Sequence, residues 1–218
     1  MGRIAEDVLL LLLDNASAQP VLPQRLSRRL LAAAVLLDLA YDGRIRPALP
    51  DETAQGCLVA LVGPPPLDPV ARPALALLQR TPLTPATAVG KLSKRVEDDV
   101  LDQLLRTGQI RQVQLKSGRF KANAYAWPLN DRARVDAVRA AVLAVLFEGQ
   151  FPDPPTAAVI ALLHACDGLG TLFNLNDRGR EWGVQRAGEI SSGSWVSDNQ
   201  MGEINLAVTI AAVRNTLT

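Results

Sequence analysis

The sequence predicts a mainly α-helical fold, with residues 1–218 forming a single domain around a central helical bundle that carries two small β-hairpins. Apolar residues make up 48% of the 218 residues and aromatic residues only 4%. This composition favours helices packed through small and branched side chains. Apolar residues also recur at helical spacing through most of the chain. No internal repeat and no domain-splitting linker interrupts the pattern.

The segment QRLSRRLLAAAVLLDLAY is expected to be the central helix. It follows Pro23, which suits a first helical turn, and it precedes Gly43, which suits a helix stop. Its interior is apolar on nearly every side, as in a buried helix. The other expected helices cover residues 3–13, a segment ending at Gln79, and residues 81–108, 131–148, 156–168, 176–190 and 204–217.

Two hairpins are expected. The first pairs GRIRPAL with GCLVALV across the polar PDETAQ, and the second covers residues 109–127. A two-residue turn at Ser117-Gly118 would set Leu115 beside Phe120 and Lys116 beside Arg119. Like charges placed opposite each other are unfavourable for the hairpin, so an external anion is a reasonable explanation for them.

Positive charge is concentrated around the second hairpin although the whole chain has a formal net charge of +1. Residues 91–139 contain eleven Lys or Arg against six Asp or Glu. A local positive field of this kind attracts anions even when the whole protein is nearly neutral. The candidate head-group-binding residues are Arg25, Arg28, Arg29, Lys91, Lys94 and Arg95. The candidate membrane-contacting residues of the hairpin are Leu115, Lys116, Arg119, Phe120 and Lys121.

Catalytic and metal-binding patterns are not found, so we expect no enzyme, no cofactor and no metal site. The single histidine, His164, stands in an apolar helix and is expected to be a core residue. Cys57 and Cys166 stand in apolar surroundings and are expected to be buried free thiols. The three carboxylates at 97–99 point in different directions on a helix, which indicates a solvated face.

The apolar run from Val8 to Leu13 is too short for a signal peptide or a transmembrane helix. We therefore expect a cytoplasmic protein whose membrane contact is peripheral. Two other functions stay open: a winged-helix-like DNA-binding regulator and a protein-binding scaffold. A helix followed by a basic hairpin favours the winged helix. Three observations count against the winged helix: acidic residues on that helix, the low net charge, and a Pro-rich segment in place of a preceding helix. Nucleic acid is therefore not the favoured partner.

Five segments occur in an order that resembles a known family. They are RIAEDVLLLLLD, LLDLAYDGRI, KLSKRVEDDVLDQLLRTGQI, AYAWPLND and ALLHACDGLGTLF. The series resembles the Golgi phosphoprotein 3 family, which has many actinobacterial members. The chain contains nineteen Arg but only four Lys, and it is rich in Ala. This composition is expected from GC-rich coding and suits a bacterial member of the family.

The resemblance implies a helical domain that binds membranes peripherally by recognising phosphatidylinositol 4-phosphate or a similar anionic phospholipid. In eukaryotic members the pocket uses a Trp and an Arg near the central helix and two Arg three residues apart before the hairpin. These positions fall at Pro23, Ala32, Lys94 and Glu97 here, so the match is partial. The resemblance also implies that the second hairpin assists membrane insertion and self-association.

Overall fold

The computed structural model describes residues 3–115, 124–196 and 201–217. Within these residues the chain forms ten helices and two antiparallel two-stranded sheets, which confirms the mainly α prediction. The helices are α1 (Ile4–Leu12), α2 (Gln24–Tyr41), α3 (Ala71–Arg80), α4 (Pro85–Leu92), α5 (Val96–Arg106), α6 (Ala133–Phe147), α7 (Pro154–Ala165), α8 (Gly168–Phe173), α9 (Asp177–Ser191) and α10 (Met201–Arg214). The strands are β1 (Ile45–Pro47), β2 (Leu58–Ala60), β3 (Val113–Leu115) and β4 (Ala124–Ala126).

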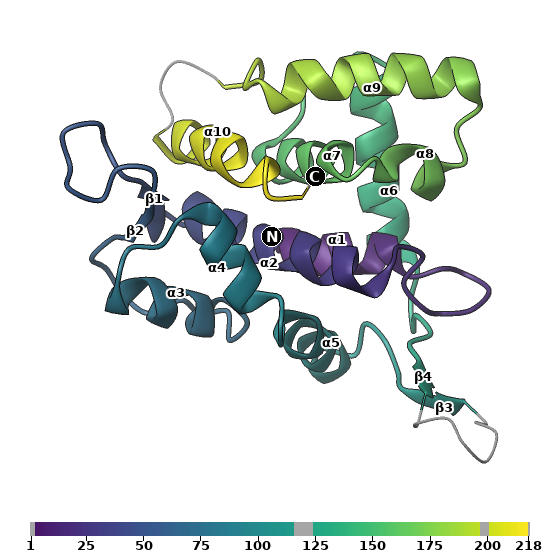
Figure 1. Cartoon of the computed structure of the whole chain (residues 1–218). Helices are drawn as coiled ribbons and strands as arrows, with labels where there is room; N and C mark the ends of the chain where they lie inside the picture. Colours follow the sequence, from purple (N-terminus) through teal and green to yellow (C-terminus); the bar gives the residue numbers. More distant parts are fainter. Residues whose placement is uncertain (1–2, 116–123, 197–200, 218) are drawn as a thin grey trace.

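Helix α2 is the central element, as its apolar interior predicts. Every residue from Leu30 to Ala40 is buried. The helix packs against α1, α3, α4, α5, α7 and α10, and Figure 1 shows it in the middle of the helical body. Ala32, Ala33 and Ala34 are fully buried, and their small side chains let neighbouring helices approach closely.

The predicted continuous helix at 81–108 is wrong, because α4 ends at Leu92 and α5 begins at Val96. The hydroxyl of Ser93 donates a hydrogen bond to the Gly90 carbonyl at 3.1 Å, and the Arg95 N–H donates to the Leu92 carbonyl at 3.2 Å. These bonds close a tight turn between the helices. Both α4 and α5 pack against α2, so the break lets two short helices bury their apolar sides on the same central helix.

Helix α9 forms as predicted despite its three glycines. A Cβ at Gly183 would lie 3.5 Å from both Leu175 and Phe147, and one at Gly179 would lie 3.1 Å from Asn176 Oδ1. That Asn176 oxygen caps the helix by accepting a bond from the Gly179 N–H at 2.8 Å. A side chain at Gly179 would therefore crowd the capping oxygen, whereas a Cβ at Gly183 would make an ordinary van der Waals contact.

The second hairpin forms with a different register from the predicted one. Val113 pairs with Ala126 and Leu115 with Ala124, so the predicted pairing of Leu115 with Phe120 is wrong, and the predicted turn at Ser117-Gly118 lies outside the described residues. Contacts with the loop after α1 hold β4 in this register. The Trp127 N–H donates to the Ala18 carbonyl at 2.7 Å.

The two hairpins project from opposite ends of the helical body in Figure 1, β1–β2 at one end and β3–β4 at the other. The first hairpin forms as predicted, with Ile45 paired with Ala60 and Pro47 with Leu58. Among the described residues, no helix combines the length and apolar composition that a membrane crossing requires.

Candidate functional site

The first turns of α2 carry three arginines in different surroundings. Arg25 is exposed, whereas Arg28 and Arg29 are partly buried. Residues at spacings of three and four share one side of a helix, which places all three near each other. They lie at the outer end of α2, before its fully buried part begins at Leu30.

An ion pair joins these arginines to the second basic cluster. The Arg28 Nε donates to Glu97 Oε2 at 2.8 Å, across 69 residues of sequence. Glu97 lies in the first turn of α5, two residues after Arg95. The ion pair therefore holds the start of α2, which carries the first predicted cluster, beside the start of α5, which directly follows the second. We call Arg25, Arg28, Arg29, Lys91, Lys94 and Arg95 the basic face.

Glu97 corrects the prediction that the carboxylates at 97–99 are solvated. Asp98 is exposed, but Glu97 is only 7% exposed. Its position was readable from the sequence, because Glu97 is four residues before Leu101 and seven before Leu104. Both leucines are buried, so Glu97 belongs to the apolar side of α5. Its partner Arg28 could not be identified from local sequence.

Lys91, Lys94 and Arg95 are exposed around the break between α4 and α5. Lys91 lies in the last turn of α4, where a cation interacts favourably with the negative end of the helix dipole. The prediction that these residues lie near the start of one long helix is therefore wrong. In the part of the chain that the structure describes, Arg25, Lys91 and Lys94 make no ion pair.

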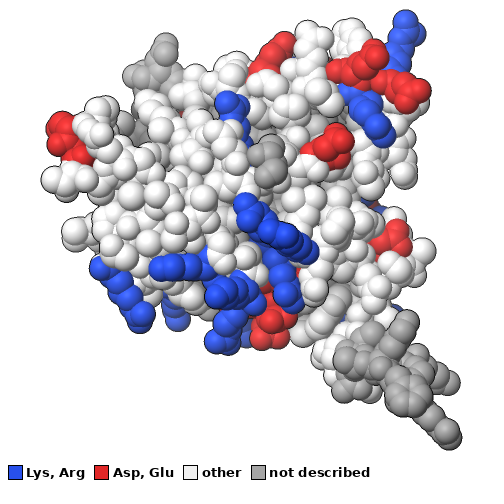
Figure 2. Space-filling view, viewed as in Figure 1, with Lys and Arg blue, Asp and Glu red and all other residues white. Residues whose placement is uncertain are grey.

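A cavity of about 500 Å³ lies at the start of α2, lined by Pro23, Arg25, Leu26, Arg29 and Leu217. The Arg29 Nε donates to the Thr216 carbonyl at 3.1 Å, which fixes the guanidinium beside the end of α10. Figure 2 shows Lys and Arg atoms in a band across the region where Figure 1 places the C-terminus, α4 and the start of α5, with acidic atoms at its lower end.

A neighbouring cavity of about 450 Å³ separates this region from the second hairpin. Arg28, Glu97 and Asp98 line it together with Tyr125 and Trp127. The two aromatic rings are 6.1 Å apart and tilted by 42°. The cavity therefore combines aromatic surface with charges of both signs.

The structure places only part of the predicted membrane-contacting hairpin. Leu115 is 36% exposed and Val113 is 40% exposed. They are two residues apart on β3, so their side chains lie on the same face of the hairpin. Lys116, Arg119, Phe120 and Lys121 lie outside the described residues.

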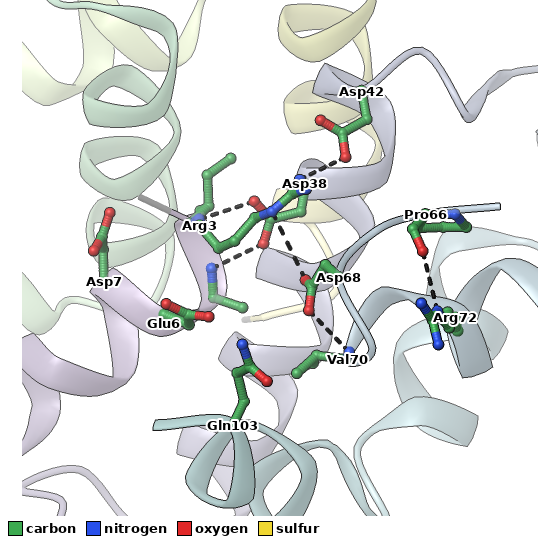
Figure 3. A network of polar contacts seen from close by, with 12 residues as sticks. Arg3, Glu6, Asp7, Asp38, Asp42, Pro66, Asp68, Val70, Arg72 and Gln103 are labelled. Carbon is green, nitrogen blue, oxygen red and sulfur yellow. Dashed lines mark hydrogen bonds and ion pairs between the residues drawn. The ribbon is translucent and has the colours of Figure 1, made fainter. Parts of the chain in front are cut away.

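Figure 3 shows a polar network where the start of α1 meets the end of α2. Asp38 Oδ1 accepts a bond from the Ile4 N–H at 2.9 Å and Oδ2 accepts one from the Ala5 N–H at 3.0 Å. Arg3 pairs with Asp42 at 2.5 Å. Burial raises the pKa of Asp38 to about 7, against these hydrogen bonds and the Arg3 charge. The backbone bonds indicate a structural clamp between two helices.

His164 and Cys166 are two further titratable groups whose pKa values are shifted. Burial lowers the pKa of His164 and raises the pKa of the Cys166 thiol to about 11, so both groups are neutral at pH 7. Cys57 and Cys166 are free, as predicted, but both are partly buried and not fully buried. Nowhere in residues 3–115, 124–196 and 201–217 do three or more potential metal ligands converge.

Comparison with known proteins extends over nearly the whole chain. A search among curated proteins found no match. The sequence model of the Golgi phosphoprotein 3 (GPP34) family matches residues 4–203, a range that runs from the first residue of α1 to the first turn of α10. The resemblance inferred from the order of five segments is thereby confirmed, and this chain belongs to the Golgi phosphoprotein 3 family.

Proposed function

We propose that this protein binds anionic phospholipid head groups at a membrane surface through its basic face. The observation that carries the proposal is the Arg28–Glu97 ion pair, because it joins two basic clusters from distant parts of the sequence. Arg25, Lys91, Lys94 and Arg95 remain exposed on this surface. Membership of the Golgi phosphoprotein 3 family supports the proposal, since the resemblance implies phosphoinositide recognition.

The strength of such binding follows from the number of free charges. A Lys or Arg side chain near an anionic membrane contributes about 1 kcal/mol. Four exposed cations therefore give about 4 kcal/mol, which corresponds to a dissociation constant of about 1 mM. Charge alone gives weak binding that is sensitive to salt. Apolar insertion or several linked copies are needed for stable attachment.

The exposed apolar face of β3 supplies such a contribution in this proposal. Val113 and Leu115 are both exposed on one face of a hairpin that projects from the helical body. A surface of this type inserts into a membrane or packs against a second copy of the chain. Self-association through the hairpin would present two basic faces to one membrane, so each copy strengthens the attachment of the other.

One observation also favours the DNA-binding alternative. The order α4, tight turn, α5 and hairpin is that of a winged helix, and the expected absence of a helix before α5 is wrong. However, Asp98 and Asp102 are exposed on α5, which would occupy the groove and meet phosphates of like charge. Because of this charge distribution, membrane binding is better supported than DNA binding. The role that we propose is binding without catalysis.

Co-sedimentation with vesicles tests the proposal. We expect the protein to sediment with phosphatidylcholine vesicles that contain phosphatidylglycerol and to stay in the supernatant with pure phosphatidylcholine. Bound protein should be released as salt concentration rises, since screening weakens exposed charges. Absence of binding at low salt would refute the proposal. A gel shift of random duplex DNA under the same conditions would instead support the winged helix.

A further inference from the structure

Two aromatic residues of the second hairpin, Tyr125 and Trp127, line the cavity of about 450 Å³ beside the starts of α2 and α5. We call it the aromatic cavity. The pairing of β3 with β4 continues in the same register to the bridge between Ile110 and Leu129, so the chain is extended through Trp127. Side chains two residues apart in an extended segment lie on the same face, which places both rings on one side of the hairpin.

The two rings are close enough to act on one ligand. Their centroids are 6.1 Å apart and their planes are tilted by 42°. An aromatic face attracts a cation that lies within about 6 Å of the ring centroid, so a single cation in the cavity can lie within that distance of both rings. Among the described residues a cation–π contact joins Arg139 to Phe173, and no Lys or Arg covers Tyr125 or Trp127.

The loop after α1 holds the backbone of both aromatic residues. The Trp127 N–H donates to the Ala18 carbonyl at 2.7 Å, and the Gln19 side-chain amide donates to the Tyr125 carbonyl at 3.2 Å. These contacts tie the segment that carries the rings to another part of the chain. A ligand therefore meets a preformed pair of rings, which reduces the cost of ordering them on binding.

The charges of the aromatic cavity favour a cation over an anion. Its charged lining groups, among the described residues, are Arg28, Glu97 and Asp98. Arg28 and Glu97 form an ion pair at 2.8 Å, so their charges offset each other. Asp98 is exposed and makes no ion pair with any residue that the structure describes. One basic and two acidic groups give the described lining a net charge of −1, although it lies beside the basic face.

The remaining lining indicates which kind of cation fits. Leu22 and the buried Leu101 add apolar surface to the two rings. A primary ammonium group has three N–H donors that each need an acceptor, whereas a quaternary ammonium group has none. A quaternary group can therefore contact apolar and aromatic surface without leaving a hydrogen bond unmade. Aromatic rings are the usual recognition surface for such groups.

We propose that the aromatic cavity binds a quaternary ammonium group. Tyr125 and Trp127 contact the cation, and Asp98 supplies the compensating negative charge. The inference goes beyond the proposed function, because it assigns a cation site beside a face that attracts anions. The ammonium group belongs either to a free solute such as choline or to the head group of phosphatidylcholine, and a soluble probe and a membrane probe separate these two sources.

The soluble probe is choline, added to the protein without membranes and followed by NMR of the indole N–H signals. The chain has three Trp residues. We expect the signal of Trp127 to shift with a dissociation constant of about 1 mM, and those of Trp182 and Trp195 to stay unchanged. Trp127→Phe assigns the signal. The uncharged isostere 3,3-dimethylbutanol has the shape of choline and should bind about tenfold more weakly or less, because it lacks the cation.

Two pairs of variants locate the site. Tyr125→Leu removes a ring and should weaken choline binding about fivefold, whereas Trp182→Leu removes an exposed ring of α9 and should have no effect. Asp98→Asn should weaken binding about threefold, whereas Asp102→Asn makes the same charge change elsewhere on α5 and should not. Tyr125, Asp98 and both control residues are exposed, so these variants should fold, as thermal unfolding verifies.

Three results would overturn the inference. The first is the absence of any shift of the Trp127 signal up to about 100 mM choline, a concentration far above the expected dissociation constant. The second is equal binding of choline and its uncharged isostere, which would show an apolar cavity without preference for a cation. The third is an equal loss of affinity in Tyr125→Leu and Trp182→Leu.

The membrane probe uses vesicles with a fixed share of phosphatidylglycerol, in which the remaining lipid is phosphatidylcholine or uncharged digalactosyldiacylglycerol. Stronger binding to the phosphatidylcholine vesicles that Tyr125→Leu abolishes would support the lipid head group as the ligand. Equal binding to both vesicles, together with choline binding in solution, would support a free ammonium solute. A preference for phosphatidylcholine that Tyr125→Leu retains would contradict the site.

The two proposals fail separately. If the protein binds neither vesicle, the proposed function is refuted, while the choline titration in solution still decides the ammonium site. If choline does not bind, the basic face can still bind phosphatidylglycerol. At lipid concentrations well below a dissociation constant of about 1 mM, the ammonium site alone leaves the protein in the supernatant with pure phosphatidylcholine, as the proposed function expects.

Discussion

Asp38 of α2 accepts a hydrogen bond from the Ile4 backbone N–H at 2.9 Å, and so caps a helix that begins 34 residues earlier in the chain. The same carboxylate accepts a bond from the Ala5 N–H. The first N–H groups of a helix have no partner within the helix. Helix α1 has no capping side chain of its own, because its N-cap residue is Arg3. The packing of α1 on α2 therefore includes a cap supplied from the neighbouring helix.

Replacing Asp38 with Asn tests this cap. The amide has one oxygen, so either the Ile4 or the Ala5 N–H loses its acceptor in the buried interior. An unsatisfied buried donor costs about 1–3 kcal/mol. We expect Asp38→Asn to lower the free energy of unfolding in urea at pH 5 by that amount. The exposed Asp102→Asn is the control, and equal stability of the two variants would contradict the account.

The stability of the protein should also depend on the protonation of Asp38. Its pKa is about 7 in the folded chain and 3.8 in the reference state, so the folded protein binds this proton more tightly. The stabilisation is complete below about pH 4 and is lost as pH rises through 7. This group alone lowers the free energy of unfolding by up to about 4 kcal/mol between pH 4 and pH 8.

Urea unfolding of the wild type and Asp38→Asn across that pH range isolates the effect. The other ionisable groups are the same in both proteins, so the difference in stability between the two proteins reports Asp38. We expect the wild type to lose stability relative to the variant as pH rises. A constant difference between pH 4 and pH 8 would show that Asp38 does not carry the linkage.

Arg134 of α6 neutralises two acids of α1 at a second buried contact. It lies 2.6 Å from Glu6 and 2.7 Å from Asp7, and each carboxylate side chain is at most 10% exposed. Burial raises the pKa of Asp7 despite this partner. Removing one member of a buried ion pair costs about 3–5 kcal/mol. We therefore expect Arg134→Met to destabilise the protein by about that amount at pH 7.

Two further measurements check that the loss comes from uncompensated charge. Adding Glu6→Gln and Asp7→Asn to Arg134→Met should recover part of the lost free energy of unfolding. Lowering the pH should also stabilise Arg134→Met relative to the wild type, because burial raises the pKa of Asp7 and this carboxylate takes up a proton once its cationic partner is gone. A loss that neither treatment reduces would point to lost packing of the arginine stem.

Self-association through the second hairpin gives a prediction about oligomeric state. Val113 and Leu115 share an exposed face of β3, so Val113→Asp with Leu115→Asp should reduce the concentration-dependent association expected of the wild type in sedimentation velocity. The control, Val184→Asp with Val208→Asp, changes two exposed valines on α9 and α10. Equal sedimentation of all three proteins would contradict a role for the hairpin.

The spacing of apolar residues correctly predicted the helices in which nearly every residue is buried. The interior of α2 is apolar on all sides, and the structure buries it as expected. The break at 93–95 was not predicted, because it depends on both short helices packing against α2. The hairpin register was missed for a related reason. The contact of Trp127 with Ala18 holds β4, and no local turn pattern contains that information.

The candidate site, too, could be predicted only in part from local sequence. Helical spacing predicted that Arg25 and Arg29 share one side of their helix. It also predicted that Lys91 and Lys94 lie on one side of theirs. The meeting of the two clusters depends on Arg28 and Glu97, which are 69 residues apart. A buried acid on the apolar side of a helix indicates that a basic partner exists. Only the three-dimensional packing identifies which residue it is.

The central claim is that position on the basic face, and not overall charge, causes membrane binding. Lys91→Gln with Lys94→Gln removes two exposed cations of that face, and Arg178→Gln with Arg180→Gln removes two exposed cations of α9. The measurement is the dissociation constant for phosphatidylglycerol-containing vesicles. We predict a loss of about tenfold or more for the lysine pair and less than about twofold for the arginine pair. Equal losses for the two pairs would contradict the claim.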